Sequence, residues 1–287
     1  MLTTAQVERF ERDGFLNAGT ILAESEVDEL CGELNALIEK GSDGFAEGEK
    51  QPVHFHRMIS GEHGEVVQIV NTWQACAAFE RLIHHPFIVR AIATLTGFDD
   101  LQVWHDQVQY KPARAGGATP WHQDAPLWPS IEPDTPVSAW LPFDDADLTN
   151  GCMWMVPGSH RWGDRIELLK GMDHLIGREE FDQISKVAFE PSVDAPIREI
   201  KAVPCPVKRG EVHFHHSLTW HGSPQNSSER PRRALAIHYM TSEARYTGRD
   251  HVMRRFIKLG VGDPMLEAGE HFPIVCRKGV PVGKDGA

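Results

Sequence analysis

The sequence predicts a mainly β protein, a sandwich or barrel whose N-terminal helices pack against one side of the β core. Residues 1–97 follow mainly helical patterns, and after them short runs rich in Val, Trp, Phe and Tyr alternate with Pro, Gly and Asp turns. Helices that come first and strands that come second place the helices against the β core. The chain has 287 residues, 41% of them hydrophobic, which is enough for one large core.

The helical part begins with two amphipathic segments. Thr3 or Thr4 can cap a short helix that Gly14 ends. Ser25 can cap a second helix that ends before Gly41. This second helix carries an apolar stripe made of Val27, Leu30, Leu34, Leu37 and Ile38.

The rest of the helical part contains a loop and two more helical patterns. Residues 41–64 are rich in Gly, Glu and His, and we expect them to form a loop. Helical pattern returns over Trp73–Ile83. Pro86 suits the first turn of a further helix that Gly97 ends. The side chains expected to be buried on that helix are Ile88, Ile92 and Leu95.

The later part of the chain is expected to supply the β core. The candidate strands are Leu101–Tyr110, Val137–Phe143, Cys152–Val156, Val212–His216 and Ala234–Met240. Several short strands broken by turns are typical of a sandwich or barrel.

We expect a single domain over residues 1–287. It would comprise a helical part (1–97), a β core (98–245) and a C-terminal extension (246–287). The segment at about 163–196 has weak pattern and much charge, so it could be a lid inserted over the barrel mouth or a plain surface connection.

Composition argues against several classes of function. The formal net charge is −12, from 41 acidic and 29 basic residues, whereas a nucleic-acid binder normally needs a basic face. The five cysteines form no CxxC pair, so a disulfide framework and a structural zinc site are not expected. Neither a signal peptide nor a membrane-spanning run is evident. We therefore expect a cytoplasmic monomer or homodimer that acts on a small molecule, without a nucleic-acid or membrane partner.

Two residues that can ligate a metal stand two positions apart in Trp121-His122-Gln123-Asp124. If this segment is extended, His122 and Asp124 point to the same face, because side chains alternate along a strand. We expect the third ligand to be His221, which follows Asp124 by 97 residues. Two imidazoles and one carboxylate leave three positions open, which is the ligand set of non-haem Fe(II) oxygenases. Two of these positions can take a chelating 2-oxo acid, and the third can take O₂.

The HxD pair alone is weak evidence, because the chain has 16 histidines and similar short patterns occur at 54–56 and 104–106. An arginine makes the pattern more specific. Arg232 follows His221 by 11 residues and opens the next predicted strand. Its guanidinium could bind the far carboxylate of a dicarboxylate bidentately while the other end of that molecule chelates the metal. Ser223 can add a hydroxyl hydrogen bond.

Three other histidines compete with His221 for the role of third ligand. His213 and His215 share one face of the strand predicted over 212–216, and His216 lies on the other. One of them should face the barrel interior, and we expect His216 to be an interior histidine or one that supports a ligand. His221 is preferred because a glycine-serine pair and the arginine spacing follow it.

The chain resembles the phytanoyl-CoA dioxygenase family of Fe(II)/2-oxoglutarate oxygenases over most of its length. The opening LTTAQVERFERDGFL is similar to the helical start of that family. The later signatures are WHQD, NGCMWMVPGSH and HGSPQNSSERPRRALAIHY, in this order. The resemblance implies a double-stranded β-helix, a cupin-like jelly-roll barrel with helices packed outside. It also implies Fe(II), 2-oxoglutarate and O₂ as cofactor and co-substrates.

The resemblance also assigns roles residue by residue. It implies that His122, Asp124 and His221 hold the iron, that Arg232 pairs with the 2-oxoglutarate carboxylate, and that Ser223 places a hydroxyl beside it.

The same resemblance concerns three further positions. Trp140 stands where the family often has a tryptophan that lines the co-substrate pocket. Gln107 lies on the strand before HxD, where it can face 2-oxoglutarate. Gln68 stands where some members carry a lysine, and this departure leaves its role open.

The residues allow two other readings of the function. One is a metal-dependent hydrolase or isomerase on a cupin-like barrel, which would use a divalent metal to activate water. The other is a barrel that binds without catalysing. The arginine after His221 favours the oxygenase, since a hydrolase has no need of a 2-oxoglutarate carboxylate site. The sequence does not identify the substrate, and we expect a small polar or moderately apolar metabolite.

Several aromatic and basic residues could lie near the pocket without an assigned role. His54, His56 and Arg57 are in a predicted loop that could fold over the site, and His160 follows a Pro-Gly-Ser turn. Large aromatics are more often core than cavity wall, and those that could line a cavity are Trp128, Trp154 and Trp162.

Overall fold

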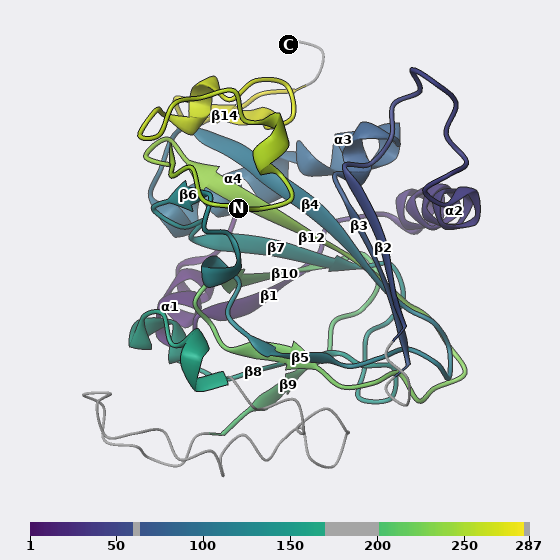
Figure 1. The fold of residues 1–287 in the computed structure, drawn as a ribbon. Helices are drawn as coiled ribbons and strands as arrows, with labels where there is room; N and C mark the ends of the chain where they lie inside the picture. The colour runs from purple at the N-terminus through teal and green to yellow at the C-terminus, as the bar shows by residue number, and fades with distance from the viewer. Residues whose placement is uncertain (60–63, 170–200, 284–287) are drawn as a thin grey trace.

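Two antiparallel sheets and four α-helices make up most of the computed structural model, which describes residues 1–59, 64–169 and 201–283 (Figure 1). The large sheet runs β1-β10-β7-β12-β4-β14-β15, and β2 joins it through β3, which pairs with β4. Its strands are β1 (Phe15–Thr20), β2 (His54–Ile59), β3 (Glu65–Val70), β4 (Leu101–Lys111), β7 (Val137–Pro142), β10 (Glu211–His216), β12 (Arg232–Thr241), β14 (Ile274–Arg277) and β15 (Val280–Pro281).

The small sheet runs β5-β11-β8-β9 and lies below the large sheet in Figure 1. Its strands are β5 (Thr119–His122), β8 (Met153–Met155), β9 (Val203–Cys205) and β11 (His221–Ser223). A short pair of strands, β6 (Ile131–Glu132) and β13 (Arg245–Tyr246), stands apart from both sheets. Six 3₁₀ segments complete the described elements: η2 (Thr72–Gln74), η3 (Ala125–Leu127), η4 (Ser159–Trp162), η5 (Ile166–Leu169), η8 (Arg254–Phe256) and η9 (Met265–Glu267).

The helices begin and end largely where capping chemistry predicts. They are α1 (Thr4–Asp13), α2 (Glu24–Lys40), α3 (Ala77–Ile83) and α4 (Pro86–Thr96). The Thr3 hydroxyl accepts a hydrogen bond from the Gln6 N–H at 3.3 Å, and Gly14 ends α1 with a φ of 82°. The expectation that Ser25 caps α2 is wrong. This helix is capped at Ala23, whose N–H donates to the Glu26 carboxylate at 2.7 Å.

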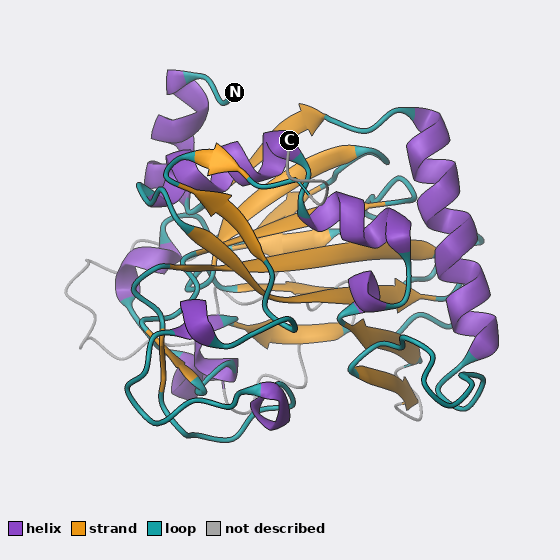
Figure 2. Cartoon of the chain, turned by 90° about the horizontal axis from the view of Figure 1, so that it is seen from above, coloured by secondary structure: helices purple, strands orange, loops and turns teal. Residues whose placement is uncertain are grey.

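Side-chain alternation on the large sheet separates a hydrophobic face from a functional face. On β12, Leu235, Ile237 and Tyr239 belong to the core cluster that also includes apolar side chains of all four helices. Their neighbours Ala236 and His238 face the opposite way and line a cavity between the sheets. The helices lie over and beside the large sheet in the view from above (Figure 2). The predicted arrangement of helices outside a β core is therefore confirmed.

The prediction that residues 1–97 are mainly helical is wrong in part. β1, β2 and β3 all fall in this region, and β2 lies inside the predicted loop over 41–64. β1 pairs with β10, and β3 pairs with β4. These strands exist because distant segments supply their hydrogen bonds, which no local pattern reveals.

Two further predicted segments are the lid-like insertion and the C-terminal extension. The lid-like segment at about 163–196 falls mostly outside the described residues. The C-terminal extension adds β14 to the large sheet, next to β4. Within the three described ranges, no helix is both long and apolar enough to span a membrane.

Candidate metal and co-substrate site

The three predicted metal ligands lie together at the small sheet. His122 ends β5, His221 begins β11, and the two residues are direct partners across these antiparallel strands. One potential ligand atom from each of these histidines and from Asp124 can be chosen so that all three lie within 4.8 Å of one another. Among the described residues this is the one group of three or more that could hold a metal ion. The geometry therefore brings together the two histidines and the carboxylate that the sequence singled out.

Backbone carbonyls hold both imidazoles in the orientation that metal binding requires. His122 Nδ1 lies 2.8 Å from the Pro120 carbonyl oxygen, and His221 Nδ1 lies 2.9 Å from that of Thr219. A carbonyl can only accept, so each Nδ1 carries the proton and each Nε2 keeps its lone pair. The two Nε2 atoms lie 3.3 and 3.6 Å from Asp124 Oδ1. Three potential donor atoms thus converge on one point.

Asp124 reaches the site by a turn and not by strand alternation. β5 ends at His122, and Asp124 has helical backbone angles (φ −71°, ψ −49°) at the start of η3. The N–H groups of Asp124 and Ala125 both donate to the carbonyl of Ser217, at 2.8 and 3.2 Å. The prediction that the two ligands share an extended strand is wrong, although their convergence is correct.

His215, on β10, holds the second oxygen of the carboxylate. Its Nε2 lies 3.1 Å from Asp124 Oδ2, and both side chains are buried. This contact leaves Oδ1 free to face the two other imidazoles. The expectation that His216 plays this supporting part is wrong. His216 points to the opposite face, where its ring centre lies 5.3 Å from that of His160 and its Nδ1 accepts the N–H of Leu218.

Replacing His215 with Phe should weaken Fe(II) binding by about 10- to 100-fold, because partners that orient a metal ligand contribute that much affinity. The measurement is competition for Fe(II) against a coloured chelator under anaerobic conditions. His213→Phe is the matched control, since His213 shares the strand face and burial of His215 but has no hydrogen bond to Asp124 among the described residues. Equal affinities of the two variants would contradict the supporting role.

The charges of the site favour an ionised carboxylate beside a neutral His221. Burial acts to lower the pKa of His122, but the hydrogen bond and the charge of Asp124 outweigh it and raise this pKa. Burial acts to raise the pKa of Asp124, but the surrounding histidines outweigh it and hold this pKa well below its usual range. Burial, followed by repulsion from His122, lowers the pKa of His221 to about 3. A carboxylate and a neutral imidazole are the protonation states in which these groups bind a divalent metal.

The Arg232 guanidinium is buried next to the Ser223 hydroxyl and has no acidic partner among the described residues. Arg232 is fully buried, and its Nη1 and Nη2 make only long contacts of 3.4 Å, to the Gln109 carbonyl and the Ser223 hydroxyl. Its Nε has no acceptor in the ranges that the structure describes. Burial lowers the pKa of Arg232 to about 10. A buried cation with spare donors is suited to a ligand carboxylate.

A second buried cation, which sequence reasoning missed, stands next to Arg232. Lys111 on β4 is the direct strand partner of Arg232 on β12. The Lys111 ammonium donates to the Ser223 hydroxyl at 2.5 Å and carbonyl at 3.1 Å, and to the Pro224 carbonyl at 2.9 Å. Burial, reinforced by Arg232, holds the pKa of Lys111 well below its usual value. Neither cation forms an ion pair with a carboxylate in the described part of the chain. In the sequence, Lys111 looks like an ordinary lysine at the end of a strand.

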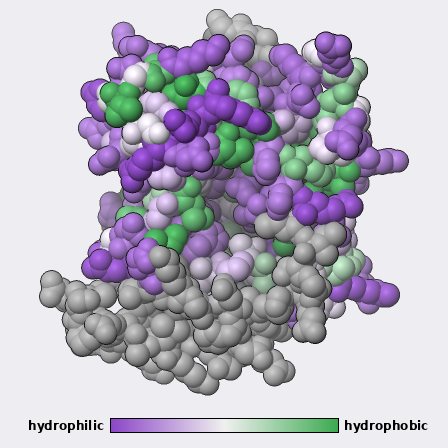
Figure 3. All heavy atoms as spheres, in the orientation of Figure 1, coloured by the Kyte–Doolittle hydropathy of each residue, from purple (hydrophilic) through white to green (hydrophobic). Residues whose placement is uncertain are grey.

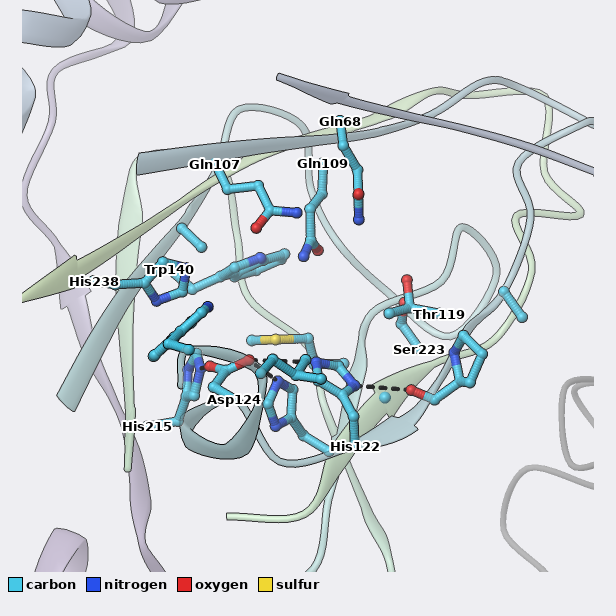
Figure 4. A pocket seen from close by; sticks show the side chains of 18 residues that line it. Gln68, Gln107, Gln109, Thr119, His122, Asp124, Trp140, His215, Ser223 and His238 are labelled. Carbon is cyan, nitrogen blue, oxygen red and sulfur yellow. Dashed lines mark hydrogen bonds and ion pairs between the residues drawn. The ribbon is translucent and has the colours of Figure 1, made fainter. Parts of the chain in front are cut away.

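A cavity of about 260 Å³ connects the metal ligands with this region. Trp140, Gln107 and Ser223 all line it, as the sequence predicted for a co-substrate pocket. The Trp140 ring centre lies 5.7 Å from the guanidinium carbon of Arg232. In Figure 4 the glutamines lie on one side of the cavity, and His122 and Asp124 lie on the other. The space-filling view shows a hollow in the middle of the face seen in Figure 1, with hydrophilic and hydrophobic side chains around it (Figure 3).

Most residues without a predicted role lie elsewhere. His54 and His56 are exposed and stack on each other along β2, and Arg57 pairs with Glu65 at 2.9 Å. None of these residues, nor His160, is among the described residues that line the cavity. Of the three tryptophans considered, only Trp128 lines it.

Fold and site together define a jelly-roll protein with two histidines and one carboxylate brought together beside two buried cations. The chain belongs to the phytanoyl-CoA dioxygenase family, whose model matches residues 10–234. The resemblance seen in the sequence is thereby confirmed.

The chain is similar to several known proteins at low identity. It is 26% identical over 272 residues to phytanoyl-CoA dioxygenase domain-containing protein 1 of Bos taurus. That match covers 83% of this chain and 90% of that protein. It is 23% identical over 267 residues to the peroxisomal phytanoyl-CoA dioxygenase of Rattus norvegicus. That match covers 90% of this chain and 76% of that protein. The crystal structure of SnoK, a non-heme alpha ketoglutarate dependent carbocyclase from nogalamycin biosynthesis, matches with a TM-score of 0.71 and 27% identity over 95% of this chain and 96% of that one. The jelly-roll fold predicted here is the fold of that enzyme.

Proposed function

We propose that this chain is an Fe(II)- and 2-oxoglutarate-dependent dioxygenase that hydroxylates a small molecule. The reaction would couple hydroxylation to decarboxylation of 2-oxoglutarate to succinate and CO₂, with O₂ supplying the oxygen atoms. The observation that carries the proposal is a buried site with two parts. Three potential metal ligands line the cavity. The buried cations Arg232 and Lys111 lie next to Ser223 in its wall and pair with no carboxylate among the described residues.

The residues fit Fe(II) in donor type and in the charge of Asp124. His122 and His221 would bind it through Nε2, because their Nδ1 atoms are tied to backbone carbonyls. Asp124 would bind through Oδ1 while His215 keeps Oδ2. A set with no thiolate and with open positions suits a non-haem iron that activates O₂. The protein contributes the orientation of the donors and a carboxylate kept ionised by its neighbours.

The same cavity fits a five-carbon dicarboxylate with a 2-oxo group. Its 2-oxo acid end would lie at the metal, with Gln107 on the wall opposite. Its far carboxylate would meet Arg232 and the Ser223 hydroxyl, where Lys111 adds a second positive charge. Trp140 would pack along the carbon chain between these ends. Each of the protein groups is held by the sheets before any ligand binds, which reduces the entropy lost on binding.

The buried cations separate this proposal from its alternatives. A metal-dependent hydrolase or isomerase needs a metal and water, and it gains nothing from two unpaired cations in its core. A binding module without catalysis has no need of open metal positions. Membership of the phytanoyl-CoA dioxygenase family also supports an oxygenase-type enzyme. SnoK is a carbocyclase, so membership of the family supports an oxygenase-type enzyme, and hydroxylation is the reaction that we propose for it.

The test is an anaerobic titration of the metal-free protein with Fe(II) and then with 2-oxoglutarate. We expect a weak visible charge-transfer band from the chelate, lost in His221→Ala. His160→Ala is the matched control and should keep the band, since His160 does not line the cavity. A protein that binds Fe(II) but gives no band with 2-oxoglutarate would overturn the proposal.

A further inference from the structure

The register of the large sheet arranges the side chains of its functional face in rows that cross the strands. One row contains Lys111 and Arg232, which are direct strand partners. A second row crosses four neighbouring strands and consists of His215, Ser138, His238 and His105. His238 follows Arg232 by six residues on β12, which is roughly 20 Å along a strand. We call the second row the histidine row.

The histidine row lies away from the co-substrate end of the cavity. Gln109 and Gln107 fill the positions on β4 between the two rows, and Gln68 is the strand partner of Gln109. The Gln109 carbonyl contacts the Arg232 guanidinium, so these amides belong with the co-substrate. In Figure 4, His238 and the labelled Ser223 lie on opposite sides of the cavity. The co-substrate therefore leaves the histidine row to another ligand.

His238 has one ring nitrogen that the protein holds and one that it does not. The side chain is only 3% exposed, and it lines the cavity. Its Nδ1 lies 2.7 Å from the Ser138 hydroxyl oxygen. Its Nε2 has no hydrogen-bond partner within the part of the chain that the structure describes. Buried polar groups normally have a partner, so a ligand in the cavity can supply the one that Nε2 lacks.

The Ser138 hydroxyl decides which of these two nitrogens carries the proton. Burial lowers the pKa of His238 to about 4, so the ring is neutral at pH 7 and has one N–H. Ser138 is fully buried, and among the described residues its hydroxyl bonds to His238 alone. If Nδ1 carried the proton, the hydroxyl would accept it, and its own proton would be buried without an acceptor. The hydroxyl therefore donates to Nδ1, and Nε2 offers an N–H to the cavity.

The surface around this N–H is apolar. The ring centre of Trp128 lies 4.3 Å from that of His238, and Trp128 lines the cavity together with Leu127. Leu127 is 48% exposed, although most large apolar side chains of the described residues are covered. Both residues follow the metal ligand Asp124 within four positions. A single donor set in an apolar surface suits an apolar molecule that carries an acceptor oxygen.

We propose that His238 recognises the primary substrate by donating a hydrogen bond from Nε2 to a carbonyl oxygen on an otherwise apolar skeleton, which packs against Trp128 and Leu127. The proposal rests on the proposed oxygenase function and adds the substrate class and the residue that selects it. His215 of the same row binds the Asp124 carboxylate, so a skeleton held at His238 lies beside the metal ligands. A site that hydrogen-bonds a polar group rejects analogues that lack this group.

The first experiment compares ketones with alkenes of the same skeleton. The probes are acetophenone with α-methylstyrene, and cyclohexanone with methylenecyclohexane, so that C=CH₂ replaces C=O. Binding to the full chain with Fe(II) and 2-oxoglutarate is measured by anaerobic equilibrium dialysis. The preference is the Kd of the alkene divided by the Kd of the ketone. It should be about tenfold lower in His238→Leu than in the wild type, because leucine offers no donor.

Two further variants show whether the N–H or the ring matters. His238→Gln supplies an amide N–H in place of the ring and should keep the preference within about threefold of the wild type. His56→Leu makes the same exchange as His238→Leu at an exposed histidine outside the cavity and should leave the preference unchanged. Equal preferences in the wild type and His238→Leu, a glutamine variant that behaves like the leucine variant, or no binding of either ketone would overturn the proposal.

The tautomer of His238 provides a test that needs neither a probe nor a stable variant at the ring's binding partners. The metal-free wild type is isotopically labelled at its histidine nitrogens, and its ring signals are recorded by NMR. The signals of His238 are those missing from His238→Gln. We expect the proton on Nε2 and a free lone pair on Nδ1 that accepts from Ser138. A proton on Nδ1 would contradict the proposal.

The dialysis samples also separate this failure from failure of the proposed function. The visible band of the Fe(II)–2-oxoglutarate chelate is recorded in each sample before a probe is added. A band without the expected dependence on His238 overturns the substrate class alone. Absence of the band in the wild type overturns the oxygenase assignment, whatever the probes do.

Discussion

Replacement of Asp124 with Asn should abolish Fe(II) binding and, with it, release of succinate. Asp124 Oδ1 is the one anionic donor at the centre, 3.3 and 3.6 Å from the two imidazole nitrogens. Asparagine has the same shape but no charge, so the divalent ion would lose the negative charge among its donors. We expect the affinity to fall by more than the roughly 100-fold that loss of an outer contact can cost.

Fe(II) affinity and succinate release are both measured for this variant. Asp147→Asn is the control, because Asp147 is an exposed carboxylate that pairs with Arg230 and does not line the cavity. Circular dichroism verifies that both variants fold. Retention of wild-type Fe(II) affinity by Asp124→Asn would remove this residue from the set of ligands.

Replacement of Arg232 with Met should stabilise the ligand-free protein and abolish its response to 2-oxoglutarate. The ligand-free wild type buries the Arg232 and Lys111 cations side by side without a carboxylate partner in the described residues. Taking a charge out of water is costly unless it is paired, and exchanging buried ions for apolar groups is often neutral or stabilising by about 1–4 kcal/mol. Methionine fills similar space and loses only two contacts of 3.4 Å.

The measurement is thermal unfolding under anaerobic conditions with Fe(II), with and without 2-oxoglutarate. At a concentration 100 times its Kd, a ligand that binds only the folded state adds about 2.7 kcal/mol of stability. We expect this gain in the wild type and almost none of it in Arg232→Met. The variant would thus trade function for stability.

Arg233, the next residue along the chain, supplies a control whose expected effect on stability is opposite to that of Arg232→Met. Arg233 faces the other side of β12 and binds the Asp144 carboxylate, with Nε 2.9 Å from Oδ2. Arg233→Met should lower the stability, because it leaves Asp144 without its partner, and should keep the full response to 2-oxoglutarate. A loss of ligand-free stability in Arg232→Met, together with a retained response, would show that Arg232 is structural.

The chemistry of the centre could be predicted because it depends on residue types and short spacings. His122 and Asp124 stand in one four-residue motif, and Arg232 follows His221 by 11 residues, from the start of β11 to the start of β12. The predicted strands near 101–110, 137–143 and 234–240 also correspond to β4, β7 and β12. Alternation correctly placed His213 and His215 on one face of β10.

The sequence misjudged features that depend on distant partners. Whether Asp124 extends β5 or turns into η3 is decided by the carbonyl of Ser217, 93 residues later in the chain. His215 supports the carboxylate because β10 packs where its imidazole meets Asp124. Such contacts leave no local trace, since their energy comes from pairing segments far apart in sequence.

By itself, the sequence predicted the helices, the main strands, the three candidate donors that the structure brings together and the arginine that follows them, because periodicity, capping and motif spacing are local. Only the tertiary structure decided that Lys111 is a buried partner of Arg232 and that Gln68 and Gln109 face the cavity together. An isolated lysine or glutamine in a sequence reads as a solvated side chain. The register of the strands decides whether such a side chain is buried or faces a cavity, and the register is set by the whole sheet.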